Sequence, residues 1–173
     1  MLEVHMILWS RLEAFVLDEP GASHPFSSRL AKEQGWTHAE TARVLREYKR
    51  FLFLAAVAGH PVSPSEPVDH AWHLHLLYTR SYWQRLCREV LAFDLHHEPS
   101  QGGVGERVKF HTWYAQTLES YRFHFDENPP ADLWPEPGGK RSGGGGARWF
   151  EPARYWLVPK FWPFRRGGHS PFA

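Results

Sequence analysis

The chain has 173 residues and 42% hydrophobic residues, which fits one domain with a sizeable core. Its formal net charge of +1 excludes an overall basic field of the kind that draws proteins to nucleic acid or anionic membranes. The single cysteine, Cys87, excludes an intramolecular disulfide framework and favours a reducing compartment.

The N-terminal segment carries charged residues, among them Glu3 and Arg11, and has neither a basic start nor a small-residue cleavage site. Elsewhere no window approaches the roughly 18 uncharged apolar residues that a membrane-spanning helix needs. We therefore expect a cytoplasmic protein without a membrane association.

Apolar residues at spacings of three and four predict two helices before residue 35. The first runs from Leu2 to about Asp18 and ends before Pro20. Its predicted stripe consists of Leu2, Met6, Trp9, either Leu12 or Glu13, and Val16. The second covers residues 25–34, and Gly35 follows its end.

A third helix begins at a capping box formed by Thr37 and Glu40 and ends at Gly59. A fourth is predicted over residues 66–91, with Ser65 as its cap and Pro67 tolerated in its first turn. On this helix His75 falls on the apolar face, and His73 points about 200° away from it.

A fifth helix is predicted over residues 104–125, and its stripe places His111 toward the core. The fold class is therefore mainly α, an irregular bundle of four to five helices over residues 1–136. Residues 137–173 are an extended, aromatic, Pro/Gly-rich tail rather than an independent domain.

Histidines in and around the fourth helix predict a site for a divalent metal, with zinc as the default. Three or four ligands must converge from different segments, because one helix presents only neighbours three or four positions apart. One possible set is His75 and His111 with His96 or His97 from the loop between the helices. The other is Asp69 and His73 with one of those two loop histidines. Either set leaves room for a water that the metal acidifies, which allows hydrolytic activity.

Two other interpretations stay open. Inward histidines are often core residues held by hydrogen bonds, so the W-H-x-H motif can be structural. The basic, aromatic tail is also typical of a non-enzymatic module that binds a protein or RNA partner.

The stretch VDHAWHLHLLYTRSYW, followed by LHHEPSQGG, resembles the glycine-rich domain-containing protein-like family, and its bacterial members in particular. The motif is VDxxWHxHLLxTxxY, and the similarity extends over roughly residues 25–135. The matching positions are Val68, Asp69, Trp72, His73, His75, Tyr82 and one of His96 or His97. The resemblance implies an association with RNA binding in the plant members, and it carries over no catalytic residue.

Overall fold

The computed structural model describes residues 3–97 and 104–137, and these form a helical bundle. No described residue lies in a β-strand, so the predicted mainly α class is confirmed. The elements are five α-helices and one π-helix: α1 (Glu3–Ala14), α2 (Phe26–Gln34), α3 (His38–Val57), α4 (Glu66–Leu77), the π-helix η1 (Arg80–Leu91) and α5 (Val104–Phe125).

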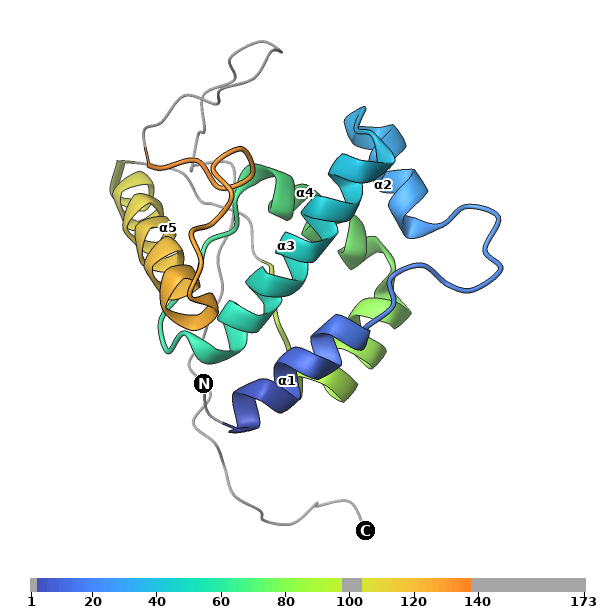
Figure 1. Ribbon diagram of the computed structural model, residues 1–173, viewed down its shortest axis with the longest axis horizontal. Helices are drawn as coiled ribbons and strands as arrows, with labels where there is room; N and C mark the ends of the chain where they lie inside the picture. The colour runs from blue at the N-terminus through green and yellow to red at the C-terminus, as the bar shows by residue number, and fades with distance from the viewer. Residues whose placement is uncertain (1–2, 98–103, 138–173) are drawn as a thin grey trace.

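Helix α3 runs through the middle of the bundle, with α5 on one side and α1 and α2 on the other (Figure 1). It packs against α1, α2, α4 and α5. Its apolar stripe, which includes Tyr48, Phe51 and Leu52, is fully buried. The predicted capping box is present: the Glu40 backbone N–H donates to Thr37 Oγ1 at 3.2 Å and the Thr37 N–H to Glu40 Oε2 at 2.8 Å.

The single helix predicted over residues 66–91 is wrong, because the chain turns between α4 and η1. At Tyr78 the backbone leaves the helical region, with φ −88° and ψ 61°. The turn lets Trp72 Nε1 donate to Tyr82 Oη at 2.8 Å. In a straight α-helix two residues ten positions apart lie about 15 Å apart along the axis. The contact therefore requires the turn, which no glycine or proline in the sequence signals.

Helix α1 ends at Ala14 rather than at about Asp18. The next residues are not helical and their burial alternates, with Phe15 and Leu17 buried and Val16 half exposed. This period of two explains why the helical stripe fails at Val16. Met6, the other residue wrongly expected inside, is also exposed.

Helix α5 has the predicted bounds, but its inward face differs from the predicted one. Its buried residues include Phe110, Tyr114 and Tyr121, whereas His111 is exposed. At about 100° per residue, His111 lies a quarter turn from the face through Phe110 and Tyr114. The stripe was misjudged because α5 carries large apolar or aromatic side chains on most of its faces.

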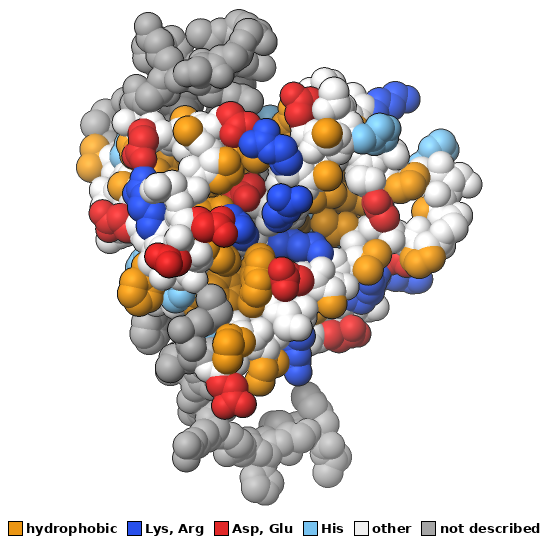
Figure 2. Space-filling model, viewed as in Figure 1, with side chains coloured by type: hydrophobic (Ala, Val, Ile, Leu, Met, Phe, Trp, Pro, Cys, Tyr) orange, Lys and Arg blue, Asp and Glu red, His pale blue; other side chains and the backbone are white. Residues whose placement is uncertain are grey.

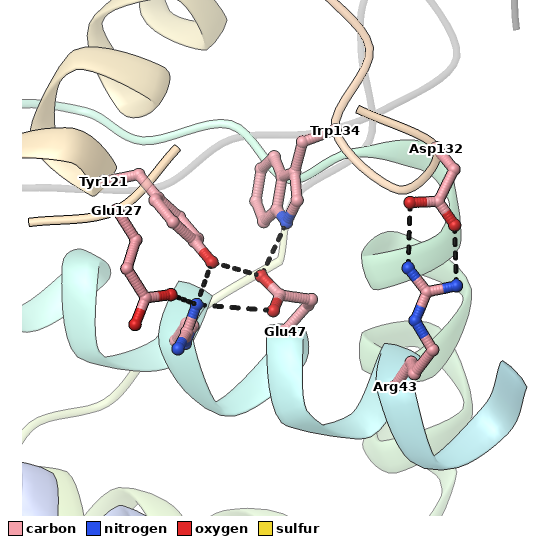
Figure 3. Close-up of polar contacts among 7 residues, drawn as sticks. Arg43, Glu47, Tyr121, Glu127, Asp132 and Trp134 are labelled. Carbon is pink, nitrogen blue, oxygen red and sulfur yellow. Dashed lines mark hydrogen bonds and ion pairs between the residues drawn. The ribbon is translucent and has the colours of Figure 1, made fainter. Parts of the chain in front are cut away.

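A set of polar contacts, buried around Glu47 and exposed at Arg43 and Asp132, joins α3 to α5 and to the segment that follows it (Figure 3). Glu47 Oε2 accepts hydrogen bonds from Tyr121 Oη and Trp134 Nε1, each at 3.0 Å. Arg50 donates to Tyr121 Oη and to Glu127, and Arg43 pairs with Asp132 at 2.7 Å. Burial raises the pKa of Glu47 more than Arg50, Tyr121 and Trp134 lower it.

The surface of the described residues shows mixed charge. On the face drawn in Figure 2, basic and acidic side chains are interspersed, and its described part has no extended area of one sign. Among the described helices, none is both long enough and apolar enough to cross a membrane. The predicted aromatic tail, from residue 138 on, lies outside the described residues.

Candidate metal centre

Asp69 and His73 begin the site on one strip of α4. Because they are four residues apart, their side chains are neighbours on the helix surface. Asp69 Oδ2 lies 3.4 Å from His73 Nδ1. The Asp69 side chain is completely buried, whereas 43% of the His73 side chain is exposed. The strip therefore runs from the interior to solvent.

His97 comes to this strip from the segment after η1. That helix ends at Leu91, and the left-handed backbone of the next residue, Ala92 (φ 61°), redirects the chain. His97 Nε2 lies 3.0 Å from Asp69 Oδ1, and only 4% of the side chain is exposed. The His97 ring also packs on Trp72 and on His73, with centroid distances of 4.3 Å in both cases. Two aromatic contacts and one carboxylate thus fix this imidazole.

Together these three side chains can hold a metal ion. One ligand atom from each of Asp69, His73 and His97 lies within 4.8 Å of the others. Asp69 Oδ2 is buried and has no hydrogen-bond partner, because its 3.4 Å contact with His73 is an ion-pair distance without hydrogen-bond geometry. A buried carboxylate oxygen left in this way is costly unless a further group satisfies it.

His75 lies on the other side of α4, as the helical spacing predicts, and is completely buried. Its Nδ1 lies 2.9 Å from Tyr48 Oη and its Nε2 lies 3.0 Å from Ser81 Oγ. Burial, with a smaller contribution from Arg85, lowers the pKa of His75 to about 3. Both ring nitrogens are therefore engaged by the protein, and the ring stays neutral at ordinary pH.

The first candidate ligand set is not brought together by the described residues. His75 is held in the core, His111 is exposed on α5, and His96 is exposed with its ring 5.3 Å from that of Trp83. The second set, completed by His97 rather than His96, is the one whose members meet.

His70 is a neighbour of the cluster that the sequence reasoning did not consider. It precedes His73 by three positions on α4, and this spacing was the available signal. Burial lowers the pKa of His73 most, and repulsion by His97 and His70 lowers it further, against the opposing effect of Asp69. A neutral His73 is the form that binds a metal.

Fold and site together define the class of protein: it is a helical domain in which one carboxylate and two imidazoles are brought together. The chain belongs to the UCP032817-like family, whose model matches residues 17–107. The matched segment contains all three members of the cluster. No curated protein and no solved structure shows a significant match to the chain. The resemblance to the glycine-rich domain-containing protein-like family stays a prediction.

Proposed function

We propose that this protein is a divalent-metal-binding domain, with zinc as the default metal and Asp69, His73 and His97 as its ligands. The observation that carries the proposal is the buried Asp69 carboxylate, which faces two imidazoles and keeps one oxygen without a hydrogen bond. A cation between the three side chains satisfies that carboxylate and binds the two imidazoles that lie against it.

The spacing of the ligand atoms supports zinc. Bonds of about 2.0–2.1 Å to a tetrahedral ion place neighbouring ligand atoms about 3.3 Å apart. Asp69 Oδ1 lies 3.0 Å from His97 Nε2, which is close to that edge length, and one ligand atom from each of the three residues lies within 4.8 Å of the others. Small movements of the side chains bring the wider distances to that length.

Because Asp69, His73 and His97 supply only three ligands, they favour a site in which one coordination position of the metal is left for water. Structural zinc sites use four protein ligands, whereas catalytic ones use three and leave a position for water. The half-exposed His73 puts the site in contact with solvent. A zinc ion bound there lowers the pKa of its water toward neutrality, which is the chemistry of hydrolysis.

The metal content of tag-free protein tests the proposal directly. We expect about one zinc per chain by elemental analysis, and loss of that zinc in His97→Ala. His96→Ala is the matched control, because it removes the adjacent, exposed imidazole and should retain the metal. Zinc far below one per chain in the unaltered protein, after incubation with the metal, would reject the proposal.

An interaction module remains the second candidate, on a sequence observation alone. Residues 138–173 hold seven Lys or Arg and one Glu, so the tail carries a formal charge of 7 − 1 = +6. The remaining residues therefore sum to 1 − 6 = −5. A cationic, aromatic segment of this kind suits a protein or RNA partner, and a truncation described below separates it from the metal site.

A further inference from the structure

Asp69 and His73 lie on one strip of α4, and Ser65, four positions before Asp69, is the residue just before the helix. Ser65 is the N-cap residue, and the Asp69 backbone N–H donates to its carbonyl oxygen at 2.8 Å. Ser65 and Asp69 are both completely buried. The Ser65 residue thus stands one helical turn before the carboxylate of the proposed metal site.

Ser65 does not perform the capping role that its position suggests. A capping serine accepts from the backbone N–H of the second or third helical residue. Here the second is Pro67, which has no N–H, and the Ser65 side chain makes no capping bond. Its Oγ is buried without a hydrogen-bond partner. An unsatisfied buried hydroxyl costs about 1–3 kcal/mol, so its presence calls for another role.

The group that complements this hydroxyl is Asp69 Oδ2, the other oxygen on the strip that lacks a hydrogen bond. A carboxylate only accepts, and a hydroxyl can donate. Side chains of an α-helix lean toward its N-terminus, so the Asp69 carboxylate leans toward the turn that Ser65 begins.

We propose that Ser65 is a positioning residue of the metal site, whose Oγ–H donates to Asp69 Oδ2 directly after rotation about χ1 or through one buried water. This inference rests on the proposed metal function. The hydrogen bond takes one lone pair of Oδ2 and leaves its other lone pair, together with Oδ1 beside His97 Nε2, to the ion. It also holds the carboxylate in one orientation before the metal arrives, which is the usual task of a residue behind a metal ligand.

The test is a comparison of zinc affinity in the full-length protein, measured by competition with a chromophoric chelator. We expect Ser65→Ala to bind zinc about 10–100-fold more weakly, as is typical when the partner of a metal ligand is lost. Ser65→Thr, which keeps the hydroxyl, should restore most of the affinity. Ser81→Ala is the control, because it removes a hydroxyl that contacts His75 on the opposite side of α4, and it should leave zinc affinity unchanged.

A second readout separates positioning from a general loss of stability. In the Co²⁺-substituted protein the visible absorption bands should shift in Ser65→Ala and stay in place in Ser81→Ala, whatever the melting temperatures of the metal-free variants. Equal zinc affinity and unshifted bands in Ser65→Ala would overturn this inference and leave the proposed metal site intact.

Absence of zinc binding in the unaltered protein would overturn both the role of Ser65 and the proposed metal function. If Ser65→Ala does not fold, Ser65→Cys replaces it, because cysteine has a similar volume and is a weaker donor. Unchanged zinc affinity in Ser65→Cys would overturn the inference equally.

Discussion

Two histidines two positions apart on α4 have opposite surroundings. His75 is enclosed by the core, and both of its ring nitrogens contact hydroxyl groups of Tyr48 and Ser81. His73 is half exposed and lies against a buried carboxylate that keeps one oxygen without a hydrogen bond. On the core side of α4, protein groups alone satisfy both ring nitrogens of His75. The Asp69 side keeps a buried carboxylate oxygen without a hydrogen bond, and under the metal-binding proposal the same short motif serves both fold and function.

The largest effect on stability should come from removing His75 on the core side of α4. His75→Ala leaves a cavity and removes the partner of the buried Tyr48 hydroxyl and the half-buried Ser81 hydroxyl, so we expect a loss of about 2–4 kcal/mol in the free energy of unfolding. Urea unfolding measures it. The folded fraction should still bind one zinc, because His75 contributes nothing to the cluster. Loss of zinc from folded His75→Ala would contradict the division between the two sides.

The next largest effect on stability should come from zinc bound at Asp69, His73 and His97. Zinc at about 100 times its dissociation constant should stabilise the native protein by about 2.7 kcal/mol, because the unfolded chain lacks the assembled site. Thermal unfolding with and without zinc measures this gain. Asp69→Asn keeps the shape of the side chain but removes its charge, so zinc should no longer raise its melting temperature. An equal rise in both proteins would place the metal elsewhere.

Acid should distinguish the two sides by an effect that is smaller than the two above for each pH unit. His75 has a pKa of about 3 in the folded protein and an ordinary value of 6.5, so the unfolded chain binds more protons between these values. Stability is therefore full above pH about 6.5 and falls as the pH drops toward 3, by up to about 1.4 kcal/mol per pH unit. Denaturant unfolding across this range should show the slope. His75→Gln should lose that part of it, and an identical slope in the variant would contradict the prediction.

The smallest effect should come from removing the tail. Because all three cluster residues lie on α4 or just after η1, deletion of residues 138–173 should leave zinc affinity unchanged within about twofold, far less than the tenfold that 1.4 kcal/mol represents. Competition with a chelator measures it. Loss of a protein or RNA partner in the same deletion would assign that interaction to the tail. A large drop in zinc affinity would show that the tail takes part in the site.

Much of the fold was predictable because helix signals are local. The capping box of Thr37 and Glu40 placed the start of α3, and periodicity gave α5 its bounds. The turn at Tyr78 was not predictable, because it depends on the contact between Trp72 and Tyr82 rather than on a local breaker. The face of α5 was misjudged at His111 for a related reason, since only packing selects among several apolar strips.

The candidate site was predictable in part. Spacing alone paired Asp69 with His73 and separated His73 from His75. Whether His96 or His97 would complete the set was undetermined, because the conformation of the segment after Ala92 does not follow from periodicity. The role of Ser65 was hidden by its position: a serine before a helix is read as a cap, and only its unpaired oxygen indicates otherwise.

The Glu47 network has a consequence for how the protein is made. Its acceptor lies in α3, but its donors Tyr121 and Trp134 follow 74 and 87 residues later in the chain. During synthesis α1, α2, α3, α4 and η1 all precede both donors. Until Tyr121 and Trp134 have been added, the Glu47 carboxylate lacks the two hydrogen bonds that it accepts in the folded protein. This connection between α3 and the C-terminal part of the bundle therefore forms only late in translation.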